Sequence, residues 1–195
     1  MKKKFDLEKA EKAITSLLEA FGQDLTDINL IDTPKRVAKY WNEVLEGELY
    51  TNDEIIKMYD KQFDLPTSNN MVVVSDISAF SHCCHHLALI YDLKISIAYI
   101  PKDKVIGLSK IARIADMVSK RLQLQERICE DIAYIMKQIL KTDNIAVIAE
   151  GKHGCMSARG IKKPGSITHT EVLDGQFKTD NMLISRFYSL IEKRN

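Results

Sequence analysis

The chain has 195 residues, a length that fits one domain, or one domain with a helical appendage, and that can bury a core without disulfide staples. Its 28 basic and 27 acidic residues give a formal net charge of +1, which supports neither a nucleic-acid nor a membrane partner. No apolar run approaches the ~20 residues needed to cross a bilayer, and the N-terminus lacks the apolar stretch of a signal peptide. We therefore predict a soluble cytoplasmic protein that has neither nucleic acid nor a membrane as partner.

The N-terminal third is predicted to be helical. Apolar residues recur at three- and four-residue spacing from Leu7 to Phe21. A second helix is expected to begin at Asp32-Thr33-Pro34, because proline suits the first helical position, and a third at about 53–59. The polar stretch PTSNN (66–70) indicates a turn, and we place the organisational boundary there. The two predicted regions are a helical N-terminal region, 1–66, and a second domain, 67–195.

From residue 71 onward the pattern changes to short β-branched or alternating segments separated by amphipathic helices. The predicted order at the centre of this region is β-β-α-α-β-β, and the predicted fold class is α+β. The strands are expected at 71–77, 91–100, 144–150 and 166–173, and the helices at about 107–122, 125–141 and 180–192.

Cysteine and histidine residues gather in two short segments. The chain contains four cysteines and five histidines, and most of them lie in FSHCCHH (80–86) or in the segment His153–Cys155. Thiolates and imidazoles are the ligands that zinc prefers. Cys83-x-x-His86 together with Cys155 would supply three ligands and leave the fourth position open, as in catalytic zinc sites. A fourth ligand from the same cluster would instead make a closed structural site.

Two other interpretations of these residues remain open. The thiols can be small buried core residues beside structural histidines. A disulfide between the adjacent residues Cys83 and Cys84 is disfavoured, because it closes a strained ring.

A zinc site would lower the pKa of a bound water to ~7, and the spare histidines, His85 and His153, could act as general acid and base. The chemistry then implied is hydrolytic attack on an electrophilic carbon.

Basic residues flank both segments. A single lysine or arginine usually belongs to a solvated helix face, but Ser109-Lys110 stands at a helix N-terminus, where backbone amides and a cation together bind anions. Arginine suits bidentate contact with phosphate. A Walker-type nucleotide loop is absent from the sequence. The basic residues concerned are Arg36, Lys39, Lys110, Arg113, Arg159, Lys162 and Lys163.

Five segments, in order along the chain, resemble the signature blocks of the GTP cyclohydrolase I family. They are DTPKRVAKYW (32–41), F-S-x-C-x-H-H-L (80–87), AYIPKDKVIGLSKIARI (98–114), RLQLQER (121–127) and H-x-C-M-x-x-R-G (153–160). The similarity extends from about residue 5 to the C-terminus. An ordered set of blocks is far more specific than any one of them.

The resemblance implies the tunnelling fold, in which β-β-α-α-β-β units behind a helical N-terminal region associate into a β-barrel, here a homodecamer of two pentameric rings. It implies a hydrolase that uses Zn2+ to convert GTP to 7,8-dihydroneopterin triphosphate and formate, the entry to pterin and tetrahydrofolate biosynthesis. The pocket lies between subunits in this family. By matching position, the zinc ligands would be Cys83, His86 and Cys155, the acid–base pair His85 and His153, the guanine-reading carboxylate Glu126, and the triphosphate-binding residues Ser109, Lys110, Arg113 and Arg159, with Arg36 and Lys39.

The sequence departs from the family at Cys84, where a glutamate is usual, and to a smaller degree at Leu89. A carboxylate at position 84 could orient an imidazole or a water, whereas a thiol can compete for the metal. This departure keeps open a zinc-stabilised non-catalytic or altered-reaction paralog. The nitrile reductase of the queuosine pathway works through a cysteine without zinc and is disfavoured by the three retained ligands. A zinc nucleobase deaminase is disfavoured because H-x-E…P-C-x-x-C is absent.

Overall fold

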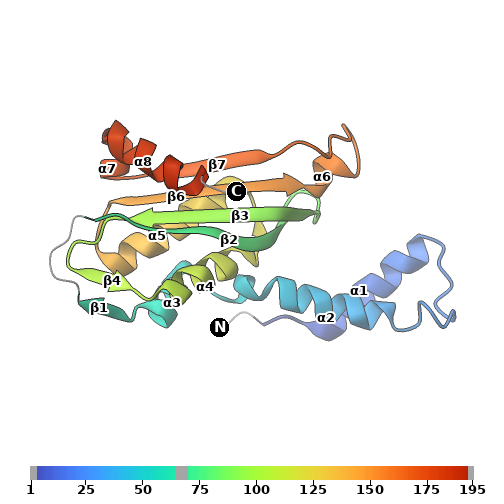
Figure 1. Ribbon diagram of the computed structural model, residues 1–195. Helices are drawn as coiled ribbons and strands as arrows, with labels where there is room; N and C mark the ends of the chain where they lie inside the picture. Colours follow the sequence, from blue (N-terminus) through green and yellow to red (C-terminus); the bar gives the residue numbers. More distant parts are fainter. Residues whose placement is uncertain (1–3, 65–69, 193–195) are drawn as a thin grey trace. The chain divides into compact units, whose positions relative to one another are not determined.

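The structure is a computed structural model that describes residues 4–64 and 70–192 (Figure 1). The chain divides into two units, Met1–Tyr50 and Thr51–Asn195. The expected boundary at 66/67 falls outside the described residues, so the division into 1–66 and 67–195 stays a prediction.

The N-terminal unit is helical, as predicted. It contains α1 (Leu7–Ala20), α2 (Thr33–Val44) and the short 3-10 helix η1 (Glu46–Leu49), and α1 packs against α2. The Asp6 carboxylate accepts a hydrogen bond of 3.0 Å from the backbone N–H of Lys9 and so caps α1. Pro34 lies in the first turn of α2, where its missing N–H costs no helical hydrogen bond.

The second unit is built on a five-stranded sheet with the order β5-β2-β3-β6-β7. All neighbouring strands are antiparallel except β5, which runs parallel to the last two residues of β2. A separate two-stranded sheet pairs β1 (Gln62–Asp64) with β4 (Lys104–Ile106). The strands of the large sheet are β2 (Val72–Cys83), β3 (Leu89–Tyr99), β5 (Leu122–Gln123), β6 (Ile145–His153) and β7 (Thr168–Leu173).

Helices cover both faces of this sheet (Figure 1). The long helices α4 and α5 pack on one face, and the short α7 and the C-terminal α8 pack on the other. The helices of the unit are α3 (Asn52–Tyr59), α4 (Leu108–Ser119), α5 (Gln125–Leu140), α6 (Gly154–Ser157), α7 (Gln176–Thr179) and α8 (Asn181–Glu192).

The core has two layers because β3 is buried on both sides over its second half. Ile97 is fully buried and, by the alternation of a strand, points to the face that α4 and α5 cover. The next residue, Ala98, points the other way and packs with its register partner Ala146 against Phe177 and Phe187 of α7 and α8. This double burial explains why β3 ends in a continuous apolar run instead of a strict alternation.

The predicted order β-β-α-α-β-β is confirmed, and the protein is of the α+β class. Two strands are longer than predicted, since β2 continues to Cys83 and β6 to His153. The sequence analysis missed β1, β4 and β5, because two or three residues are too few to show a period. Among residues 4–64 and 70–192, no helix combines the length and the apolar character needed to cross a membrane.

Candidate metal centre and active site

The two cysteine–histidine segments meet at one end of the large sheet. Cys83 is the last residue of β2, and His153 is the last residue of β6. Both strands pair with β3, in which Ile90 is opposite Ser81 on one side and His153 on the other. Pairing through β3 therefore brings together residues that are about seventy positions apart in the chain.

The side chains of Cys83, His86 and Cys155 lie close together. Their ligand atoms lie within 4.8 Å of one another, and Cys83 Sγ is 3.8 Å from His86 Nδ1. Ligands bound at 2.0–2.3 Å around a tetrahedral zinc are separated by about 3.3–3.8 Å, so only a small contraction is needed. Among the described residues, Cys84 is not part of any such group, although it follows Cys83 directly.

The surroundings of the Cys155 thiol are also compatible with a metal. Burial, together with the neighbouring Cys83, raises the pKa of the Cys155 thiol. A divalent cation bound beside Cys155 would supply a positive charge that favours its thiolate. The donor set of two sulfurs and one imidazole nitrogen is one that zinc binds in catalytic sites.

A tight turn shapes the first half of the centre. The backbone N–H groups of His86 and Leu87 both donate to the Cys83 carbonyl, at 3.3 and 2.9 Å, so residues 83 and 86 come to the same side. Leu87 adopts a left-handed conformation with φ of 52°, and the Cys83 N–H then donates to the Ala88 carbonyl at 2.8 Å. The C-x-x-H spacing therefore brings Cys83 and His86 together because the chain folds back after β2.

The second half of the centre is carried by α6. Gly154 allows α6 to approach β3 closely, since a Cβ there would meet the Leu89 carbonyl oxygen at 3.1 Å. The Ser157 hydroxyl donates to the His153 carbonyl at 3.0 Å and lies 2.9 Å from the Tyr91 hydroxyl. These contacts fix the turn on which Cys155 is held.

The residues Cys83, His86 and Cys155 are called the metal group below. The predicted acid–base residues lie beside it. His85 Nδ1 is 3.9 Å from Cys83 Sγ. His153 Nε2 is 2.8 Å from the amide oxygen of Gln125, the first residue of α5. Burial lowers the pKa of His153, and the nearby Glu126 carboxylate opposes this effect. His85 therefore lies close to Cys83, and Glu126 lies near His153, while the roles of all three stay predictions.

Gln125 is a site residue that the sequence analysis did not select. It lies inside the RLQLQER block, directly before Glu126. A glutamine side chain neither titrates nor is a preferred metal ligand, so the residue type of Gln125 did not mark it as a site residue.

The residues predicted to bind the triphosphate lie in separate parts of the structure. Arg159 is near Cys155, since its charge partly opposes the rise that burial and Cys83 cause in the pKa of that thiol. Ser109, Lys110 and Arg113 lie in the first half of α4, which begins beyond the far end of β3. Figure 1 shows β4 and α6 at opposite ends of the sheet, and α4 follows β4 directly.

The helix α4 itself keeps Ser109 away from the metal group of the same chain. Its twelve residues span about 18 Å, and only its C-terminal end leads to β5 beside Cys83. The Lys110 ammonium instead donates to the Lys61 carbonyl at 3.3 Å. The triphosphate role of these α4 residues stays a prediction that needs a second chain.

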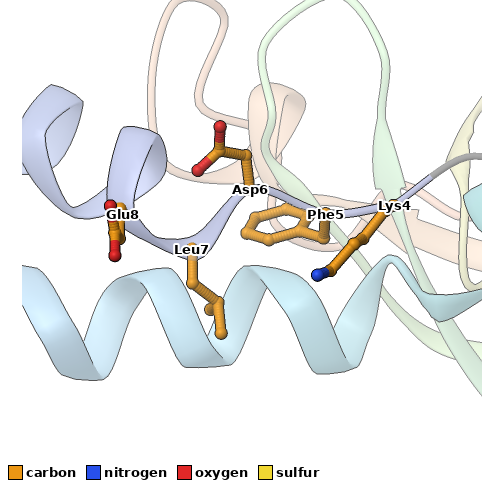
Figure 2. A pocket seen from close by; sticks show the side chains of 5 residues that line it. All are labelled: Lys4, Phe5, Asp6, Leu7 and Glu8. Atoms are coloured by element: carbon orange, nitrogen blue, oxygen red, sulfur yellow. The ribbon is translucent and has the colours of Figure 1, made fainter.

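The remaining predicted residues, Arg36 and Lys39, belong to α2 in the N-terminal unit. They line a small hollow with Asp32 and Lys35, and Arg36 forms an exposed ion pair of 3.2 Å with Asp32. Another hollow of this unit is lined by Lys4, Phe5, Asp6, Leu7 and Glu8 at the start of α1 (Figure 2). It includes none of the predicted site residues, so the sheet end remains the candidate site.

Comparison with known proteins agrees with this geometry. The family model for GTP cyclohydrolase I matches residues 10–192. The chain belongs to the GTP cyclohydrolase I family. GTP cyclohydrolase 1 of Clostridium acetobutylicum is 52% identical over 189 residues, which cover 95% of this chain and 97% of the relative.

Two further relatives of the same name show a similar likeness. The protein of Clostridium beijerinckii is 50% identical over 188 residues, 94% of this chain and 95% of the relative. That of Clostridium botulinum strain Kyoto / Type A2 is 52% identical over 193 residues, 96% of this chain and 98% of the relative. The resemblance seen in the sequence is thereby confirmed, and a non-catalytic paralog is not favoured.

Proposed function

We propose that this protein is a zinc-dependent GTP cyclohydrolase that converts GTP to 7,8-dihydroneopterin triphosphate and formate. The observation that carries the proposal is the convergence of Cys83, His86 and Cys155 within 4.8 Å at the sheet end that also holds His153. Relatives about half identical over nearly the whole chain carry the same name. An enzyme that forms this product acts at the entry to pterin and tetrahydrofolate synthesis. We expect it to act in the cytoplasm.

In this proposal Cys83, His86 and Cys155 hold zinc. When bound there, zinc supplies the Lewis acidity that brings the pKa of a water to ~7. His153 and His85 exchange protons with the ring nitrogens of the purine as its imidazole ring is opened. The Glu126 carboxylate, which is exposed, accepts hydrogen bonds from the guanine ring N–H and exocyclic amine.

The triphosphate binds to cations from more than one chain. Arg159 can reach it from beside Cys155, whereas Ser109, Lys110 and Arg113 come from the α4 helix of a neighbouring subunit. These contacts supply the binding energy that positions the purine against the metal group. Arg36 and Lys39 contribute from the N-terminal unit.

The sheet supports the tunnelling-fold assembly into a homodecamer. One edge is β7, and at the other edge β5 covers only His82 and Cys83 of β2. An open edge presents backbone donors and acceptors that another chain can pair with, and closure into a barrel satisfies them. We infer that five such sheets close into each ring of the decamer.

The test is incubation of the zinc-loaded protein with GTP, with separate measurement of formate and of the fluorescence of the oxidised pterin. We expect both products, and no formate from the Cys155→Ala variant, which lacks a metal ligand. Formate without a pterin would instead identify an altered-reaction paralog. If the metal-loaded oligomer released no formate, the cyclohydrolase assignment would be wrong.

A further inference from the structure

The buried side chain of Gln125 joins the first turn of α5 to the end of β6. This residue is 1% exposed, and its amide nitrogen donates to the backbone carbonyls of Ala149 and Thr168 at 3.1 and 2.9 Å. A third and longer contact, 3.3 Å, reaches the hydroxyl of Thr170. The other atom of the amide, Oε1, lies 2.8 Å from His153 Nε2.

These partners leave only one orientation for the amide. Backbone carbonyls accept hydrogen bonds and never donate, so the atom that faces Ala149 and Thr168 must be the NH2 group. The oxygen is therefore the atom that faces His153. Because an amide oxygen only accepts, His153 Nε2 must carry the hydrogen. In the neutral imidazole, Nδ1 then holds the free lone pair.

We propose that Gln125 is a positioning residue that fixes His153 in the Nε2–H tautomer, so that His153 exchanges a proton with the substrate at Nδ1. The catalytic part of this inference rests on the proposed function, in which His153 is an acid–base group. The tautomer itself follows from the hydrogen bonds alone.

The packing around the amide keeps it in place. Gly151 of β6 lies against Gln125, and a Cβ there would be 3.4 Å from Oε1 and 3.1 Å from Leu93 Cδ1. A larger residue at 151 would therefore press on the amide or on the core beneath it. Gln125 is also followed directly by Glu126, so the amide fixes the imidazole relative to the carboxylate predicted to read guanine.

The first measurement is the tautomer of His153 in the zinc-loaded wild-type protein. Solid-state NMR of protein labelled with ¹⁵N-histidine distinguishes protonated from unprotonated ring nitrogens, and the His153→Asn variant identifies the signals of this residue. We expect Nε2 to be protonated and Nδ1 to be unprotonated in the neutral ring. A hydrogen on Nδ1 would overturn the proposal without any substitution at Gln125.

The second measurement compares Gln125→Leu with Thr170→Val as a matched control. The leucine variant removes the acceptor for His153, so we expect a mixture of tautomers and a fall in kcat of about tenfold or more, with KM little changed. The valine variant removes one contact of the same amide but leaves the His153 bond, so tautomer and kcat should stay as in the wild type.

The outcomes separate the two proposals. If Gln125→Leu kept the Nε2–H tautomer and a normal kcat, Gln125 would have only a structural role. If the wild-type protein formed no product from GTP, the proposed function would fail, whereas the NMR result would still decide the tautomer. If the leucine variant did not fold, the wild-type spectrum would decide alone.

Discussion

Cys83 and Cys84 have the same side chain and adjacent positions, yet the fold gives them different surroundings. Cys83 is 6% exposed, and its sulfur lies in the group with His86 and Cys155. Cys84 is more exposed, stays outside that group, and is held through its backbone N–H by the Gln123 carbonyl at 3.1 Å. Residue type alone could not separate the two thiols, whereas their positions at the end of β2 do.

We predict that Cys84→Ala retains zinc and that Cys83→Ala loses it. The first change leaves all three ligands in place, whereas the second leaves one sulfur and one imidazole, which is too few to hold zinc tightly. Metal analysis of each purified variant measures the zinc per chain. X-ray absorption of the wild type should show two sulfur ligands, and a third sulfur lost in Cys84→Ala would contradict this interpretation.

Cys129 is a thiol with a different role, in the core between α5 and β7. Its side chain is 0% exposed, and its sulfur lies 3.4 Å from the Thr170 hydroxyl. Burial raises the pKa of Cys129 to about 11, from an ordinary value of 9.0. The folded protein therefore keeps this proton at a pH where the unfolded chain releases it.

This shift predicts a loss of stability in alkali. The folding free energy linked to Cys129 is fully present below pH 9 and is lost as the pH rises toward 11, at about 1.4 kcal/mol per pH unit. Urea unfolding at a series of pH values should therefore show the free-energy difference between the wild type and Cys129→Ala shrinking above pH 9. A difference that stayed constant up to pH 11 would contradict the shifted pKa.

At the scale of elements, the strand that flanks the metal group is too short to form by itself. β5 has two residues, and it is held by Asp131 of α5, whose carboxylate accepts hydrogen bonds from Arg121, Gln123 and Asn52 at 2.9–3.3 Å. The Ser81 hydroxyl of β2 adds a bond to the Arg121 carbonyl. This network keeps β5 against the strand that carries Cys83.

We predict that Asp131→Ala lowers the free energy of unfolding by about 3 kcal/mol, because it removes the carboxylate that accepts hydrogen bonds from the guanidinium of Arg121, 12% exposed, and from the buried amide of Gln123. The matched control is Asp116→Ala, which removes the exposed ion pair with Lys120 and should cost less than about 1 kcal/mol. Urea denaturation measures both values. Equal losses in the two variants would show that the buried network does not stabilise β5.

At the scale of the whole molecule, one chain holds the metal group and the first half of α4 at separate places. The metal group lies where β2 and β6 end, and the N-terminus of α4 lies about 18 Å from its C-terminal end, which leads to β5 beside Cys83. Under the proposed function, in which Ser109, Lys110 and Arg113 bind the triphosphate, a complete site would take its α4 helix from another subunit. We therefore predict that activity depends on assembly.

Subunit mixing tests this condition. Cys155→Ala removes a metal ligand and Lys110→Ala removes an α4 cation, so each variant alone should be inactive or nearly so. In oligomers formed from equal amounts of both, roughly a quarter of the sites combine two intact halves and should restore that share of the wild-type rate. No recovery in verified mixed oligomers would mean that each chain builds its own site.

Local patterns in the chain predicted the metal-ligand types and most of the helices and strands. Cys83, His86 and Cys155 could be selected because ligand type and local spacing are written in the chain, and RLQLQER contained Glu126. The long helices α1, α4 and α5 were predictable because their apolar faces repeat within each segment. The β-β-α-α-β-β order was predictable for the same reason, because each long segment shows the period of its own helix or strand.

Only the tertiary structure decided how these parts combine. The pairing of β2, β3 and β6 brings His153 to Cys83, and the side chain of Gln125 fixes which nitrogen of His153 carries the hydrogen. The strand β5 exists through its contacts with α5 and β2. The helix α4 begins far from the metal group of its own chain, and only its C-terminal end leads to β5. Each of these features depends on register and direction between distant segments, which local sequence patterns do not encode.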